Sequence, residues 1–472
     1  MKKIFFLFIA GITAIHSSGT EPIKRIVKET LLSKFGVHEF YNNSYTLSSN
    51  LRRVGFLIQK NEKFIAVVDT LQGLEYNAAT TPVFSPDGNR FAYTAKTGDK
   101  WQIVVDNKQE VSLDSGVTIN FIRFSPDNKK LLYTINDGKH VFLFFNGIKS
   151  KAYDAINENS ISFSTITNKI AYSFTLLSKQ YNVIDGKEGE AFDQVGFPLL
   201  NPNGKQYAYW AINDKKSYVV IDGKKSKPYE AVNSLKYSTD GKHLLYDVKQ
   251  QGKYLIVLDG IENESYDEIH SYALSPDGSR LAYAIKLYSG NTDEFTAYVV
   301  IDGKKEGPYE QVMVRSLQFS PDGKDLIYGV QLPKSTVTNE VKTERDEFEW
   351  FVVQNGKEQT RYNMLQGSMI FSPNSLHMAY GGELYLKRLV NIDGREEPPY
   401  DDVYHMIFSP DSKLLAYSMK LNGKEFVVVD GNNGIGYDEI SGEKEILFDS
   451  EKTFHYLAIK GDKIVLVEER IE

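Results

Sequence analysis

The chain has 472 residues, of which 41% are hydrophobic and 25% charged; this composition is typical of a globular protein and excludes a disordered or fibrous one. Its 55 Lys and Arg against 62 Asp and Glu give a net charge of -7, which disfavours nonspecific binding to nucleic acid or anionic membranes. There is no cysteine, so disulfides, zinc-thiolate sites, Fe–S clusters and cysteine nucleophiles are excluded.

Residues 1–19 predict a secretory signal peptide. A charged start, Met1-Lys2-Lys3, precedes the apolar run Ile4 to Ile15, and Ser17 and Gly19 stand at cleavage positions. The run is too short to cross a bilayer core of about 30 Å as a helix, and no later segment is apolar enough to span. We therefore expect an exported bacterial protein, periplasmic or extracellular, with no membrane span in the mature chain.

Residues 20–35 show the spacing of a short amphipathic helix. Ile23, Ile26, Val27, Leu31 and Phe35 form an i, i+3, i+4 stripe, Thr20 is an N-cap and Gly36 a stop.

An internal repeat predicts the fold. The string Phe84-Ser-Pro-Asp-Gly88 recurs at Phe124, Leu274, Phe319, Phe371 and Phe408, and weaker copies begin at Leu47, Phe163, Leu200, Tyr237 and Leu447. Each copy contains four short runs rich in Val, Ile, Phe and Tyr, separated by Pro, Asp and Gly. Four strands per repeat of about 40 residues indicate an all-β β-propeller with about ten to eleven blades, as one large ring or as two fused rings of five and six.

The chain ends suggest how the propeller closes. The last copy supplies three strands, and Gly36 to Phe40 precedes Leu47 at the same offset as Gly436 to Ile440 precedes Leu447. We expect the strand at residues 36–40 to pair with the last blade and remove two exposed edges. The propeller would then occupy residues 36–472.

The string from Leu274 to Tyr283 resembles the WD40-like repeats of the TolB propeller and its relatives. The resemblance covers about nine tenths of the chain and implies the fold. It leaves the function open, because that superfamily holds protein-binding scaffolds, peptidase gating domains and sugar-acid lyases. The chain departs from TolB itself, since it has no α/β domain and more than six repeats.

The recurrent polar residues have structural explanations. Asp-Gly pairs are what two-residue hairpins require, and the serines of the Ser-Pro-Asp-Gly strings belong to turns. The repeated tyrosine of the second strand, as at Tyr283, packs between blades, and the acid of the Tyr-Asp pairs, as at Tyr400-Asp401, is a local cap. The histidines are scattered, and His38, His270, His377 and His405 would be the candidates at the axis. We expect no catalytic residue, metal or cofactor.

Two successive copies carry insertions between their second and third strands, at residues 286–296 and 331–348. Such insertions mark loops on one face of a repeat array, often the binding face, and aromatic residues anchor interfaces. The residues expected to bind a partner are Asp293, Glu294, Phe295, Lys334, Glu344, Arg345, Phe348 and Trp350.

Non-repeating polar residues on the innermost strands are expected to line a central channel, namely Arg123, Lys236, Arg315, Gln318 and His405. The favoured function is a non-catalytic scaffold that binds a protein or cell-envelope component through rim loops and channel mouth. The alternatives are a lyase-like enzyme or carbohydrate binder with an axial site, and a gating propeller for a separately encoded peptidase.

Overall fold

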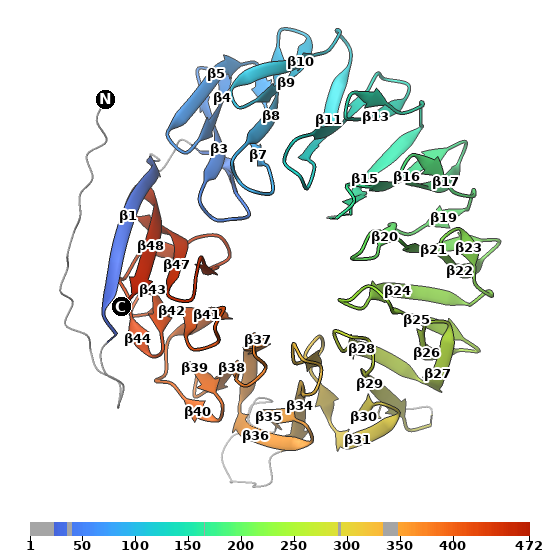
Figure 1. Ribbon diagram of the computed structural model, residues 1–472, viewed down its shortest axis with the longest axis vertical. Coiled ribbons are helices and arrows are strands. Elements are labelled where there is room, and N and C mark those ends of the chain that lie inside the picture. The colour runs from blue at the N-terminus through green and yellow to red at the C-terminus, as the bar shows by residue number, and fades with distance from the viewer. Residues whose placement is uncertain (1–22, 35–39, 165, 291–293, 334–347) are drawn as a thin grey trace. The chain divides into compact units, whose positions relative to one another are not determined.

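The computed structural model describes residues 23–34, 40–164, 166–290, 294–333 and 348–472. Every helix or strand assigned within these residues is a β-strand, so none of them is a helix that could span a membrane. The strands form eleven sheets of four or five strands, and each sheet is built from a run of consecutive strands, with one exception at the chain ends (Figure 1). Each sheet is a blade. The chain is an eleven-bladed β-propeller, which confirms the fold predicted from the repeat.

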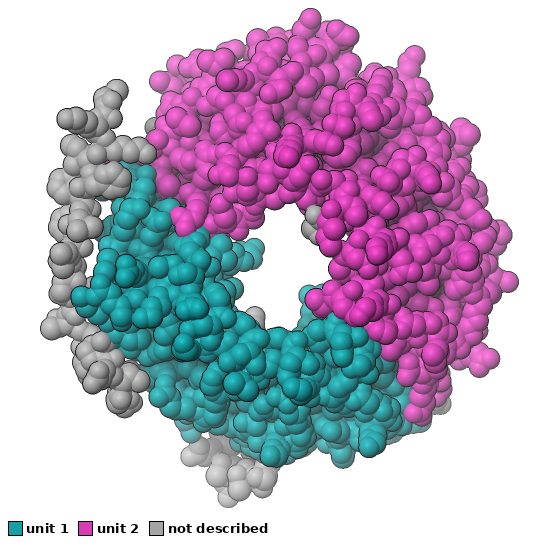
Figure 2. Space-filling view, viewed as in Figure 1, with its two compact units in different colours: residues 1–31, 266–472 teal, residues 32–265 magenta. Residues whose placement is uncertain are grey.

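The chain divides into two compact units, which Figure 2 shows in different colours. Unit 2 comprises residues 32–265 and holds blades 1 to 6. Unit 1 comprises residues 266–472 with residues 1–31 and holds blades 7 to 11.

The blades of unit 2 have the following strands. Blade 1 contains β2 (Phe40–Leu47), β3 (Val54–Lys60), β4 (Lys63–Val68) and β5 (Leu71–Tyr76). Blade 2 contains β6 (Ala78–Ala79), β7 (Val83–Phe84), β8 (Phe91–Thr97), β9 (Lys100–Val105) and β10 (Lys108–Ser112). Blade 3 contains β11 (Thr118–Phe124), β12 (Leu131–Asn136), β13 (Val141–Phe145) and β14 (Ile148–Lys149). Blade 4 contains β15 (Ala155–Phe163), β16 (Ile170–Leu176), β17 (Lys179–Ile184) and β18 (Lys187–Glu188). Blade 5 contains β19 (Gln194–Val195), β20 (Leu199–Leu200), β21 (Tyr207–Asn213), β22 (Lys216–Ile221) and β23 (Lys224–Lys225). Blade 6 contains β24 (Ala231–Tyr237), β25 (Leu244–Gln250), β26 (Lys253–Leu258) and β27 (Ile261–Tyr266).

The blades of unit 1 follow the same plan. Blade 7 contains β28 (Glu268–Leu274), β29 (Leu281–Tyr288), β30 (Phe295–Ile301) and β31 (Lys304–Tyr309). Blade 8 contains β32 (Gln311–Val312), β33 (Gln318–Phe319), β34 (Leu326–Pro333), β35 (Phe348–Gln354) and β36 (Lys357–Tyr362). Blade 9 contains β37 (Met364–Phe371), β38 (Met378–Leu384), β39 (Lys387–Ile392) and β40 (Arg395–Glu396). Blade 10 contains β41 (Asp402–Phe408), β42 (Leu415–Leu421), β43 (Lys424–Val429) and β44 (Asn432–Asn433). Blade 11 contains β45 (Glu439–Ile440), β46 (Leu447–Phe448), β47 (Thr453–Lys460), β48 (Lys463–Ile471) and β1 (Arg25–Lys34).

Burial along one blade explains why these sequences form strands that stack. In blade 7 the second strand, β29, begins with five consecutive buried residues, as expected of a strand that is covered on both faces. The fourth strand, β31, is mostly exposed. Strands three and four are joined by Asp302 and Gly303, both at positive φ (49° and 82°), as a two-residue hairpin turn requires. The Asp-Gly pairs therefore belong to turns, as predicted.

The helix expected within residues 20–35 is wrong, because Arg25–Lys34 is a strand, β1, which pairs with β48. Ile23 and Val27 pack against the core of blade 11, whereas Ile26, a member of the expected helical stripe, is 41% exposed. The true inward alternation is Ile23, Arg25 and Val27. Because the charged residue Arg25 stands in the middle of this alternation, the period of two that is typical of a strand is not evident in the sequence.

The expected closing strand at residues 36–40 is also wrong. Phe40 begins β2 and pairs with Ile58 of β3 in blade 1, and residues 36–39 lie outside the described residues. The fourth strand of blade 11 is β1, so one blade does join the two ends of the sequence, but with an earlier segment. The matching segment, residues 436–440, ends in β45, the first strand of blade 11. The shared offset therefore marks the entry to a first strand.

Candidate functional site

The recurrent tyrosines lie in pairs at the blade junctions. A tyrosine at the end of one blade meets the second-strand tyrosine of the next, as Tyr400 meets Tyr417 with ring centroids 5.9 Å apart. The same pairing of aromatic rings occurs at Tyr76–Tyr93, Tyr153–Tyr172, Phe192–Tyr209, Tyr229–Tyr246, Tyr309–Tyr328, Tyr362–Tyr380 and Tyr437–Tyr456. This confirms the prediction that these tyrosines pack between blades.

The acid that follows the terminal tyrosine caps a hairpin of the next blade. The Asp401 Oδ2 atom accepts a 2.7 Å hydrogen bond from the Asn422 N–H, the first residue of the turn between strands two and three of blade 10. Its Oδ1 atom pairs with Lys387 Nζ at 2.6 Å. Asp154, Asp193 and Asp438 accept equivalent bonds. The prediction that this acid is a cap is confirmed.

At the opposite end of the blades, each Ser-Pro-Asp turn is closed by its own serine. Ser85 Oγ donates to Asp87 Oδ1 at 2.6 Å and accepts a bond from the Arg90 N–H at 2.9 Å. The hydrogen bond from Ser85 holds the pKa of Asp87 below its usual value. Because the serine is buried and engaged on both sides, it is part of the turn.

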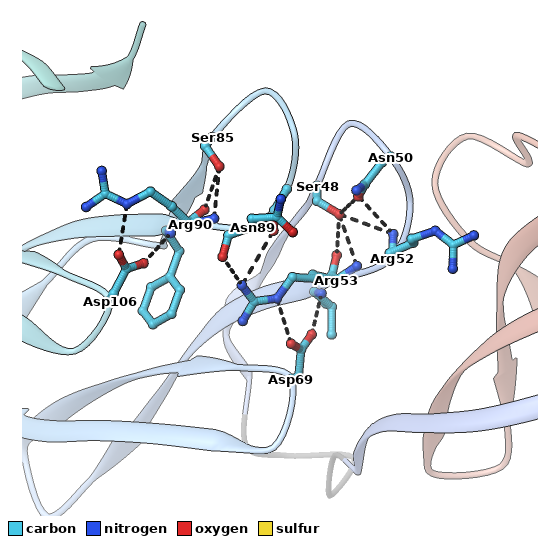
Figure 3. A network of polar contacts seen from close by, with 12 residues as sticks. Ser48, Asn50, Arg52, Arg53, Asp69, Ser85, Asn89, Arg90 and Asp106 are labelled. Carbon is cyan, nitrogen blue, oxygen red and sulfur yellow. Dashed lines mark hydrogen bonds and ion pairs between the residues drawn. The ribbon is translucent and has the colours of Figure 1, made fainter. Parts of the chain in front are cut away.

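Arginines connect these turns from blade to blade (Figure 3). Arg53 of blade 1 pairs with Asp69 (Nε to Oδ2, 2.8 Å) and donates from Nη1 to the carbonyl oxygen of Asn89 in blade 2 at 3.1 Å. Arg90 makes the equivalent ion pair with Asp106 in blade 2. The carboxylates of the third-to-fourth-strand turns thus serve the junctions as well. Among the described residues no group of three or more His, Asp or Glu side chains is placed to hold a metal ion.

The departures from the repeat gather at one end of neighbouring blades in unit 1. Among the residues expected to bind a partner, Asp293, Lys334, Glu344 and Arg345 lie outside the described residues. Glu294 and Phe295 stand where the connection enters β30, and Phe348 and Trp350 lie in β35. All four therefore lie at or near the connection between strands two and three, at the same end of blades 7 and 8.

The aromatic residues at the bases of these insertions are partly packed. Phe295 stacks edge-to-face with Tyr288 at 5.8 Å and lies under Lys286 Nζ. Trp350 pairs with Gln331 across the sheet and packs against the hydrophobic cluster between blades 8 and 9. These contacts hold the two rings at the points where the insertions meet the sheets.

A third connection at this end departs from the repeat, and sequence reasoning missed it. In blade 9 the two-residue turn between β38 and β39 consists of Tyr385 and Leu386, which are 90% and 74% exposed. The signal was present in the sequence, because Asn422-Gly423 and Asp214-Lys215 occupy the same turn in other blades.

The residues expected to line a channel lie on or beside first strands. Arg123, Lys236, Gln318 and His405 belong to β11, β24, β33 and β41, and Arg315 lies between β32 and β33. Arg123 reaches blade 4, where Nη1 donates to the carbonyl oxygen of Ile161 at 3.1 Å. Arg315 has φ of 60° and is exposed.

Two histidines on first strands of unit 1 each have a buried ring nitrogen without a hydrogen-bond partner, Nδ1 of His270 and Nε2 of His405. Burial lowers the pKa of both histidines, so both are neutral at pH 7. His377 instead pairs with Asp393 in a third-to-fourth-strand turn, and His38 lies outside the described residues.

A pocket of about 700 Å³ lies between blades 5 and 6 in unit 2. It is lined by Lys225, Lys227, Tyr229 and Glu262, among others. Lys227 pairs with Glu262 at 2.6 Å and Lys225 with Glu190 at 2.9 Å, so these cations are neutralised at the blade junction.

No protein-family model and no curated protein matches the chain. Among solved structures it is similar to a eukaryotic initiation factor, with 12% identity, a TM-score of 0.39, and coverage of 83% of this chain and 97% of that one. It is similar to the tricorn protease at 14% identity and a TM-score of 0.29, over 88% of this chain and 47% of that one. The β-propeller domain of the Trilobed protease from Pyrococcus furiosus matches at 13% identity and a TM-score of 0.28, over 60% and 95%. Similarity this distant tells nothing about function.

Proposed function

We propose that this chain is an exported, non-catalytic β-propeller of the TolB-like repeat class, which binds a protein or cell-envelope component. Binding uses the connections between strands two and three of blades 7 and 8. Export and class rest on the sequence patterns at residues 1–19 and 274–283.

The observation that carries this proposal is the contrast between recurrent and non-recurrent residues. The recurrent Tyr, Asp and Ser side chains described above are engaged in turns and blade junctions. Departures from the repeat concentrate at one end of neighbouring blades. An enzyme needs a convergent cluster of polar groups, whereas a scaffold needs only a distinctive surface.

The test is capture of partners by cross-linking in the native cell envelope. The full chain is compared with a variant in which residues 334–346 are replaced by a Gly-Ser segment of equal length. The matched control is Asp214→Asn/Lys215→Gly, which changes the ordinary turn between strands two and three of blade 5. One saturable protein partner, lost only in the first variant, is expected. Capture of the same proteins by all three chains would refute the proposal.

A second candidate function is binding of a small polar ligand, such as a sugar, at the first strands of unit 1. The ring nitrogens of His270 and His405 favour it, because each is buried without a hydrogen-bond partner among the described residues, and such an atom can accept a hydrogen bond from or donate one to a ligand. A rise in melting temperature with neutral oligosaccharides, abolished by His270→Ala or His405→Ala, would support this function. An unchanged melting temperature would exclude that ligand class.

A further inference from the structure

The hairpin tip between β38 and β39 places exposed apolar side chains at two positions of positive φ. Tyr385 and Leu386 have φ of 50° and 63°, the left-handed region that bulky residues avoid. Both side chains project into solvent, with exposed fractions of 90% and 74%. The Tyr385 backbone N–H contacts Asn363 Oδ1 at 3.4 Å.

Other blades show what this turn ordinarily contains. The equivalent two-residue turns are Asn61-Glu62, Gly98-Asp99, Asp214-Lys215, Gln251-Gly252, Asn422-Gly423 and Gly461-Asp462. Apart from blade 9, only Leu177-Ser178 of blade 4 places a large apolar residue at this turn among the described residues. Asn and Gly suit positive φ, whereas Tyr and Leu are strained there and bury nothing. Strain that the fold does not need is characteristic of functional sites.

The surroundings of the tip are electrically balanced. Lys387 Nζ pairs with Asp401 Oδ1 at 2.6 Å, and Arg388 Nη1 pairs with Glu383 Oε2 at 2.6 Å. The tip is thus a convex apolar projection over paired charges. It stands at the same end as the insertions of blades 7 and 8, in the blade that follows them.

We propose that Tyr385 and Leu386 are anchor residues that insert into an uncharged apolar pocket on the surface of a folded protein partner. This inference rests on the proposed function and names the residues that engage the partner. Tyrosine is enriched among residues that dominate interface energetics, and a few such residues carry most of an interface. A membrane is a poor occupant, because even a whole acyl chain gives only marginal binding and the protein is acidic.

The decisive variant is Tyr385→Asn/Leu386→Gly, which installs the pair that blade 10 uses. Because Asn and Gly tolerate this backbone, we expect the melting temperature to rise by about 1–3 °C. The matched control is Leu177→Asn/Ser178→Gly at the corresponding turn of blade 4. It should give a similar rise without affecting binding.

Binding is measured with the full chain carrying Tyr385→p-benzoylphenylalanine, irradiated in its native cell envelope. Unlabelled wild-type chain and the blade 4 control should compete for the cross-linked protein equally. The blade 9 variant should need at least about 30-fold higher concentration, the effect of losing a dominant contact. A fall in melting temperature of the blade 9 variant would show that the residues serve the fold, and would overturn the proposal.

Three further outcomes would overturn it. If the blade 9 variant competes as well as wild type while the 334–346 replacement does not, the anchor role of Tyr385 and Leu386 is refuted and the proposed function stands. If both variants compete as well as wild type, the anchor role and the proposed function are both refuted. Flotation with phosphatidylglycerol vesicles that depends on Tyr385 and Leu386 would replace the protein pocket by a membrane.

Discussion

At the scale of single residues, the junction tyrosines contribute both apolar area and a polar contact. Tyr417 is 0% exposed, and its hydroxyl lies 2.9 Å from that of Tyr400 in the adjoining blade. Burial raises the pKa of Tyr417 well above its ordinary value, so the hydroxyl stays protonated and able to donate. The ring fills the junction and the hydroxyl fixes its orientation.

Shortening this residue in two steps separates the two contributions. We expect Tyr417→Phe to lower the free energy of unfolding by about 1 kcal/mol, because one hydrogen bond is lost. Tyr417→Ala should lower it by about 3–5 kcal/mol, because a cavity remains. Denaturant titration of both variants measures this. Equal losses would show that ring packing contributes nothing beyond the hydroxyl contact.

The aspartates of the Ser-Pro-Asp turns make stability depend on acid pH. Hydrogen bonds from Ser275 and Ser279 lower the pKa of Asp277. A depressed pKa in the folded state means that the unfolded state binds protons first. The stability that the ionised aspartates contribute is therefore fully present above the unfolded-state pKa of about 3.9. It is lost as the pH falls through the lower pKa of the folded state.

Blade 9 supplies the design for a test, because Asn374 replaces the aspartate there and still accepts from Ser372. Changing the other turn residues to Asn should lower the melting temperature at pH 7, because the contribution of the ionised carboxylates is lost, and should make its fall below pH 4 shallower. The set is Asp87, Asp127, Asp277, Asp322 and Asp411. Melting curves between pH 3 and 7 measure this. An unchanged fall in melting temperature below pH 4 would contradict the role assigned to these carboxylates.

At the scale of elements, β1 is held in blade 11 by charged residues. Arg25 Nε pairs with the buried Glu469 Oε2 at 2.6 Å, and Nη1 donates to the carbonyl oxygens of Val427 and Asn432. Tyr437 donates to Glu29 at 2.9 Å. Lys28 pairs with Glu468 and Lys24 with Glu472, so the two strands run antiparallel.

Removing one partner of the buried Arg25–Glu469 ion pair should lower the free energy of unfolding substantially. We expect Arg25→Ala to lower the free energy of unfolding by about 3–5 kcal/mol, because Glu469 is left buried without its counter-ion. The double variant Arg25→Leu/Glu469→Leu should recover most of this loss, and Lys24→Ala, at an exposed ion pair, should change stability by less than about 1 kcal/mol. Equal losses in Arg25→Ala and Lys24→Ala would contradict the buried role.

These elements show what the sequence could and could not reveal. The blades, the turns, the junction tyrosines and the capping acids were predictable, because each follows from local chemistry repeated many times. β1 was not predictable, because its inward residue is Arg25 and the partner that allows its burial, Glu469, lies 444 positions away. Its remaining apolar residues matched a helical period by coincidence.

The features of the candidate site likewise divide into those that the sequence reveals and those that it does not. The insertions of blades 7 and 8 stand out in sequence by length alone. The turn at Tyr385-Leu386 has the ordinary length and stands out only by chemistry, once the structure gives its φ angles and exposure. The first-strand residues, such as His405, could be assigned to a strand but not to a ligand, since nothing in their spacing repeats.

At the scale of the whole molecule, the recurrent residues and the departures from the repeat are distributed differently between the two units. Junction tyrosines and capping acids recur in both units, whereas the two long connections and the tyrosine-leucine tip lie in consecutive blades of unit 1. One further exposed apolar residue at this turn, Leu177, lies outside this group, in blade 4 of unit 2. Partner recognition at this end of blades 7 to 9 is the central claim.

Hydrogen–deuterium exchange of the full chain, alone and with its captured partner, tests that claim most directly. Exchange should slow in peptides covering residues 284–297, 329–350 and 382–389, and should not change in the Ser-Pro-Asp turns at the opposite end. Slowed exchange confined to those turns or to the first strands, with the three connections unaffected, would contradict it.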